Sequence, residues 1–227
     1  MEGLAVLAGI LIAFAIDAWW DGHIEREQAD AYLSALVAEL TEAEKGYLGH
    51  LGYLELHDAR VGRILSEAES YSGNPLVMDT LLLTLGPFAP YAPPMAAFDD
   101  LEGGGGLASI ESPEIRRGIA SYRLSVERNS LTQSALAAYW ATEVKTYWDQ
   151  RINTRRLLEV ASGLYLGEFL ARDLPAVPLD PNYEELLSDR RFLNQLSTWA
   201  LDIAKVRRSN QRMLAEIDSL KILIASR

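Results

Sequence analysis

The chain has 227 residues and a net charge of −11, and 49% of its residues are hydrophobic against 23% charged. This composition excludes a disordered chain and a multi-span membrane protein, and the acidic balance argues against nucleic acid, because phosphate binding requires a basic face. There is no cysteine, which excludes thiol catalysis, disulfides and thiolate metal sites.

The first segment, Leu4 to Trp20, reads LAVLAGILIAFAIDAWW and has no charge before Asp17. The 18 residues from Gly3 to Trp20 would form a helix of about 27 Å, against a bilayer core of about 30 Å. Trp19 and Trp20 at its end suit the membrane–water interface, where indole rings gather. The sequence therefore predicts a single transmembrane anchor over residues 1–22.

Two alternatives remain for this segment. A cleaved signal peptide would find a cleavage site at Ala13-Phe14-Ala15, although Met1-Glu2 lacks the positive charge that such peptides carry. The length also permits a helix that is buried in a soluble core.

One face of the predicted anchor carries small residues at a spacing of four: Ala5, Gly9 and Ala13, followed by Asp17. Small residues at this spacing allow two membrane helices to approach closely. Asp17 either forms a hydrogen bond across such a contact or reaches the headgroup water. We expect the anchor contacts to involve Ala5, Gly9, Ala13, Asp17, Trp19 and Trp20.

Residues 23–72 are predicted to form one long helical arm, because no proline occurs before Pro75. Apolar residues recur in a coiled-coil heptad, at Leu33, Leu36, Leu40, Ala43, Tyr47, Leu54, Val61, Ile64 and Ala68, with His50 and His57 in the same register. Gly46, Gly49 and Gly52 are possible bend points in this arm.

Residues 73–111 form a connector that is rich in proline and glycine, with short helices expected over residues 76–85 and 96–101. The run Gly103–Gly106 is followed by no lysine, so we interpret it as a flexible turn and not as a phosphate loop.

Residues 112–227 are predicted to form a helical hairpin. Its first helix begins with Ser112 as the N-cap and Pro113 in the first turn, and nothing stops it before Gly163. Its last helix has a heptad seam that includes Leu196, Trp199, Ile203, Asn210, Met213 and Ile217. Asn210 either is buried and sets the register of the seam, or lies at its rim.

Together these segments predict an all-α protein in which a transmembrane helix precedes an extended antiparallel bundle of coiled-coil-like helices. His50 and His57 share a face, and no further ligand cluster matches them, which favours a polar layer over a metal site. The adjacent carboxylates Asp99-Asp100 and Glu184-Glu185 point apart on a helix. With no nucleotide or catalytic motif present, we predict neither a cofactor nor an enzyme.

Three stretches together resemble a family of uncharacterised bacterial single-span envelope proteins, a domain of unknown function. They are the anchor with its Asp-x-Trp-Trp ending and the charged helix after it, PPMAAFDDLEGGGGLASIESPEIRRGIASY, and NYEELLSDRRFLNQLSTW. The resemblance implies a membrane-anchored helical protein of the bacterial inner membrane, with its N-terminus in the cytoplasm and its bundle in the periplasm. It implies no reaction, ligand or catalytic residue.

The function expected from the sequence is that of a non-enzymatic accessory subunit. Its partners would be membrane lipid and the other subunits of a larger inner-membrane complex, for example a respiratory or photosynthetic one. The alternative is a homo-oligomeric membrane-anchored stalk or sensor, which would use the Ala5/Gly9/Ala13 row and the Leu196–Ile224 seam for self-contact.

Overall fold

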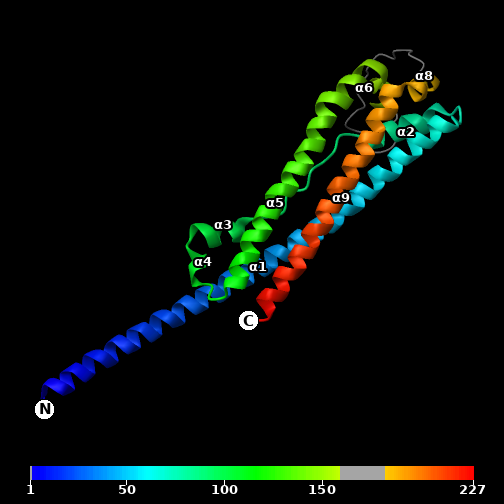
Figure 1. Ribbon diagram of the computed structural model, residues 1–227. Coiled ribbons are helices and arrows are strands. Elements are labelled where there is room, and N and C mark those ends of the chain that lie inside the picture. Colours follow the sequence, from blue (N-terminus) through cyan, green and yellow to red (C-terminus); the bar gives the residue numbers. More distant parts are fainter. Residues whose placement is uncertain (1, 159–181) are drawn as a thin grey trace. The chain divides into compact units, whose positions relative to one another are not determined.

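The computed structural model describes residues 2–158 and 182–227, with the backbone alone for residues 2–8 and 18. These residues form helices, and no strand occurs among them. The helices are α1 (Glu2–Glu69), α2 (Pro75–Leu85), α3 (Ala96–Gly103), α4 (Gly106–Ser109), α5 (Pro113–Tyr139), the π-helix η1 (Trp140–Val144), α6 (Lys145–Arg151), α8 (Tyr183–Ser188) and α9 (Arg190–Ala225) (Figure 1). The prediction of an all-α chain is confirmed.

The chain divides into two compact units that share the three longest helices. Unit 1 comprises Met1–Gly46, Pro93–Glu127 and Met213–Arg227, and unit 2 comprises Tyr47–Ala92 and Arg128–Arg212. In each unit, segments of α1, α5 and α9 supply the core, and the short helices complete it.

The buried side chains of α1 follow the predicted heptad. Ala68 is partly buried, and every other predicted seam position of this helix from Leu33 to Ile64 is buried. The helix continues through Gly46, Gly49 and Gly52 without an interruption of its helical assignment. The three glycines therefore do not end the helix, and the seam positions on both sides of them are buried.

Unit 1 joins the first part of α1 to α3, the start of α5 and the end of α9. Lys221 pairs with Glu44 at 2.6 Å, and Arg227 pairs with Asp30, so α9 runs antiparallel to α1. Phe98 of α3 stacks on Tyr122 of α5 with ring centroids 4.9 Å apart.

The glycine run between α3 and α4 packs against α1. Gly103 ends α3 and Gly106 begins α4, and Gly105 between them has a φ of 73°. A Cβ at Gly106 would lie 2.9 Å from Cε2 of Tyr32, closer than side chains pack. The run therefore forms the predicted turn between two helices, and the close approach of Gly106 to the Tyr32 ring adds a packing requirement for glycine there.

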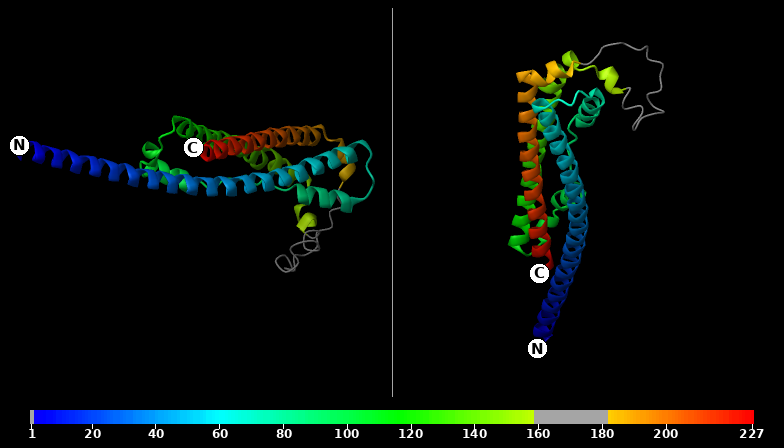
Figure 2. Two further views of the ribbon diagram at one scale, coloured as in Figure 1. Left: turned by 90° about the horizontal axis from the view of Figure 1, so that it is seen from below. Right: turned by 90° about the vertical axis from the view of Figure 1, so that its right-hand side faces the viewer.

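Unit 2 contains an apolar core cluster whose members range from Leu54 of α1 to Val206 of α9. Asn74 caps α2, and α2 folds back along α1, where Nη1 of Arg60 donates to the Thr84 carbonyl at 2.7 Å (Figure 2). The proline-rich segment is held by Gln133, whose amide accepts from the Tyr91 N–H at 2.7 Å and donates to its carbonyl at 3.0 Å.

The helix that begins at Pro113 ends earlier than predicted. Ser112 caps it, with Ile115 N donating to Ser112 Oγ at 3.3 Å, as the sequence indicates. The chain then passes through the π-helix η1 and leaves helical geometry at Ile152, where φ is −111° and ψ is 130°. Asn153 then accepts a hydrogen bond from Arg156 N and starts a new helical turn, so the expected continuation to Gly163 is wrong.

Candidate functional site

The start of α1 exposes an unusual number of large apolar side chains. Ile10, Leu11, Ile12, Phe14 and Ile16 are between 49% and 67% exposed. Consecutive helical residues are about 100° apart, so these five side chains surround most of the helix, and the apolar residues Gly9 and Ala13 lie in the remaining sector. A helix that is apolar all round belongs in a nonpolar environment, because water offers its surface no partner.

An aromatic cluster follows this apolar segment directly. The rings of Trp19 and His23 are stacked at 5.8 Å, and Trp19 and Trp20 lie 6.3 Å apart. Both tryptophans are more than half exposed, and His23 approaches Glu27 at 3.5 Å. The order along the helix is therefore apolar, aromatic and then charged, which matches the order of environments at a membrane surface.

The predicted row of small residues lies on this same segment. The side chain of Ala5 lies outside the described residues, whereas Ala13 and Asp17 are exposed. A Cβ at Gly9 would have no described atom within 4 Å. No described residue covers Gly9, Ala13 or Asp17, so this part of the row is accessible to another helix.

In the part of the chain that was described, no helix is both long enough and apolar enough to span a bilayer.

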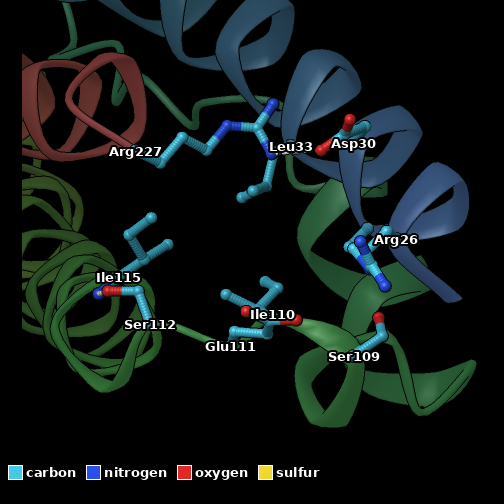
Figure 3. Close-up of a pocket in the computed structure, with 10 residues that line it drawn as sticks. Arg26, Asp30, Leu33, Ser109, Ile110, Glu111, Ser112, Ile115 and Arg227 are labelled. Atoms are coloured by element: carbon cyan, nitrogen blue, oxygen red, sulfur yellow. Dashed lines mark hydrogen bonds and ion pairs between the residues drawn. The ribbon is translucent and has the colours of Figure 1, made fainter. Parts of the chain in front are cut away.

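Just beyond the aromatic cluster, unit 1 contains a cavity of about 490 Å³ (Figure 3). Three segments line it: α1 with Arg26, Ala29, Asp30 and Leu33, the α4–α5 junction with Ser109, Ile110, Glu111, Ser112 and Ile115, and Arg227, two residues after the end of α9. Its lining is mixed, with apolar side chains beside two arginines and two carboxylates.

The predicted seam of α9 lies inside the chain's own bundle. Leu196, Trp199 and Ile203 in unit 2 and Met213 and Ile217 in unit 1 are each at most 2% exposed. This burial leaves these side chains no surface for a second chain, so they serve the chain's own core.

Asn210 is fully buried in unit 2, so the rim position considered for it is wrong. Its Oδ1 accepts from Asn129 Nδ2 at 3.2 Å, and its Nδ2 lies 2.9 Å from His50 Nδ1. The His50 Nε2 lies 3.1 Å from the Ala89 carbonyl, which can only accept. His50 is therefore the neutral Nε2–H tautomer, and Asn210 donates to its Nδ1.

Burial governs the protonation of both histidines in this layer. Burial lowers the pKa of His50, and the hydrogen bond to the Ala89 carbonyl opposes that effect. Burial, followed by the positive charge of Arg60 and the neighbouring His50, lowers the pKa of His57 to about 4. Among the described residues, no group of three or more histidine and carboxylate side chains is arranged to hold a metal ion.

A buried ion pair in the middle of α2 was not predicted from the sequence. Asp79 has no exposed surface, and Arg156 Nε donates to its two oxygens at 3.0 and 2.8 Å. The hydroxyl of Tyr183 donates to the same carboxylate, and burial with this contact raises the pKa of Tyr183. The only sequence signal was a lone aspartate within the apolar stretch PLVMDTLLLTL of α2.

A second set of contacts surrounds the π-helix η1. The Glu143 carbonyl in this segment accepts from Gln195 Nε2 at 3.0 Å, and Trp140 packs on Trp148 and Trp199 at 5.0 and 4.8 Å. A π-turn leaves a carbonyl without its usual helical partner, and Gln195 supplies the replacement donor. This arrangement stabilises unit 2 and presents no paired acid and base.

Comparisons with protein-family models, with curated proteins and with solved structures find no match to this chain. Its function is therefore inferred from its own residues.

Proposed function

We propose that this protein is a single-span subunit of the bacterial inner membrane, anchored by residues 1–22. Its helical bundle would lie in the periplasm and dock, without catalysis, onto a larger membrane-protein complex. The observation that carries the proposal is the apolar surface from Ile10 to Ile16, which is exposed on every side of α1. A surface of this kind has an unfavourable free energy in water and a favourable one in lipid.

The aromatic cluster supports the same proposal. Trp19, Trp20 and His23 would lie at the headgroup level, where rings with one polar atom gather. Asp17 is exposed two residues before Trp19 and would reach the headgroup water.

The buried seam of α9 supports a docking subunit over a self-assembling stalk. Trp199 and Ile217 are buried within the chain, so of the two self-contacts predicted for a homo-oligomer only the anchor row stays exposed. That second candidate retains one favourable observation, which is the uncovered row at Gly9 and Ala13.

The test is to extract the full chain from native membranes in mild detergent and to measure the mass and composition of its complex. A fixed stoichiometry with unrelated subunits supports the docking proposal. A multiple of 25.2 kDa without other proteins contradicts it and supports the homo-oligomer.

Variants separate the two candidates further. Gly9→Ile would break a self-contact through the anchor row, and Leu11→Phe serves as the matched control off that row. If Gly9→Ile alone reduces a homo-oligomer to the monomer, the anchor row is the self-contact. If Gly9→Ile alone releases the chain from unrelated subunits, the row is a docking contact.

A further inference from the structure

The cavity in unit 1 combines apolar lining side chains with two arginines. Ala29, Leu33, Ile110 and Ile115 are at most 7% exposed. Arg26 of α1 and Arg227, two residues after α9, border the same space (Figure 3). A cavity of about 490 Å³ is large enough to hold a small organic group.

The two arginines retain donors that can bind a ligand. Arg26 Nε donates to the Gly22 carbonyl of its own helix at 2.9 Å, and its two terminal nitrogens have no acceptor among the described residues. Arg227 uses Nη1 on Asp30. Arginine binds phosphate oxygens with two parallel donors, which favours such a group over a carbonyl or an amine.

The position of the cavity along α1 matches the headgroup layer. Arg26 lies six residues after Trp20 on the same helix, which corresponds to about 9 Å. The headgroup region adds about 5–8 Å on each side of the hydrocarbon core. If Trp20 lies at the interface, the Arg26 side chain is within reach of lipid phosphates.

We propose that this cavity binds the phosphodiester headgroup of a membrane phospholipid. The guanidinium groups of Arg26 and Arg227 would hold the phosphate, and the glycerol end of the lipid would lie against Ile110 and Ile115. This inference rests on the proposed membrane anchor, because it is the anchor that brings the cavity to the lipid surface.

The charged side chains at the cavity should favour a phosphodiester over inorganic phosphate. Asp30 and Glu111 also border the cavity, so it carries two positive and two negative side chains. The two carboxylates oppose a doubly charged inorganic phosphate more strongly than a singly charged phosphodiester. They also suit the ammonium group of an ethanolamine headgroup, which makes a zwitterionic phospholipid the best match.

The experiment uses the full chain, purified in detergent and freed of lipid, and measures binding by native mass spectrometry. The probes are a short-chain phosphatidylethanolamine, the diacylglycerol with the same chains, and inorganic phosphate. The variants are Arg26→Gln and Arg227→Gln. The matched control is Arg117→Gln in the same unit, because its side chain is 76% exposed and lies outside the cavity.

We expect one phospholipid per chain, with a Kd raised at least tenfold in Arg26→Gln and in Arg227→Gln and unchanged in Arg117→Gln. Equal binding of diacylglycerol would overturn the proposal, because the phosphate would then not be recognised. Inorganic phosphate bound as tightly as the phospholipid would overturn it as well, since the ligand would then be a soluble anion.

Membrane extraction of the same protein distinguishes this failure from failure of the anchor. A chain that stays in the membrane but binds no phospholipid contradicts only the cavity proposal. A chain that leaves the membrane yet binds the lipid in an Arg26-dependent way contradicts only the anchor.

Discussion

Asn210 of α9 and His50 of α1 share a buried hydrogen bond of 2.9 Å, in which the asparagine amide donates to the unprotonated ring nitrogen. The two residues are 160 positions apart, and the contact fixes the register of the two helices in unit 2. A polar pair in an apolar seam penalises any shifted register, because the shift would bury both groups without partners.

We predict that Asn210→Ala destabilises the protein by about 1–3 kcal/mol for each polar group it leaves unpaired. Those groups are His50 Nδ1 and one amide hydrogen of Asn129. The measurement is urea unfolding of the full chain in detergent, followed by circular dichroism. Gln211→Ala, at the exposed neighbouring position, should change the stability by less than about 0.5 kcal/mol. Equal effects of the two substitutions would contradict the role of this layer.

The histidines predict a loss of stability in acid. Their pKa values are lowered in the folded state, to about 4 for His57, against about 6.5 in the unfolded chain. The unfolded state therefore binds more protons between these values. The free energy of unfolding should fall as the pH drops from about 6.5 to 4, by up to about 1.4 kcal/mol per pH unit for each proton.

The control for this pH dependence is His23, which is half exposed and outside the buried layer. His57→Gln should flatten the stability profile between pH 4 and 6.5, whereas His23→Gln should leave its slope unchanged. If stability still falls with pH in His57→Gln and in the His50→Gln/His57→Gln double variant, other groups cause the acid sensitivity.

Removing one partner of the buried Asp79–Arg156 pair should lower the folding stability far more than removing one partner of an exposed pair. Arg156→Ala leaves a carboxylate with no exposed surface and should cost about 3–5 kcal/mol. Arg151→Ala is the matched control, because Arg151 is 47% exposed where it pairs with Glu185 and should cost at most about 1 kcal/mol. Thermal unfolding measures both. Similar losses in the two variants would contradict the importance of burial at Asp79.

The glycine run predicts that Gly106→Ala is destabilising by about 1–3 kcal/mol, since the new methyl group would overlap the Tyr32 ring. Gly103→Ala is the control, because its Cβ would meet no described atom within 4 Å. A double variant with Tyr32→Ala should recover part of the loss at Gly106. Additive losses would show that the two residues do not interact.

The sequence predicts the helices well wherever the apolar period is regular. The seam from Leu33 to Ile64 and that from Leu196 to Ile224 are both buried, because a heptad leaves one face for the core. The end of the helix at Arg151 could not be predicted, since no proline or glycine marks it. The position of this end depends on the π-turn at Trp140–Val144. It also depends on Asn153, which accepts a hydrogen bond from Arg156 N and caps the next helical turn.

Contacts between residues that are far apart in the sequence could not be predicted either. The sequence offers Asp79 as a lone charge in an apolar helix, but it does not indicate that Arg156 and Tyr183 complete the cluster. The arginines of the cavity, Arg26 and Arg227, lie near opposite ends of the sequence, so no local spacing relates them. By contrast, the apolar start of α1 was evident from composition alone.

Membrane attachment through residues 1–22 is the central claim, and alkaline carbonate extraction of cell membranes tests it most directly. The full chain is compared with a variant that lacks residues 2–20, and a chain-specific antibody follows both through sedimentation. We predict that the full chain stays in the membrane pellet and that the shortened variant moves to the supernatant. Recovery of the full chain in the supernatant would contradict the anchor and the subunit role built on it.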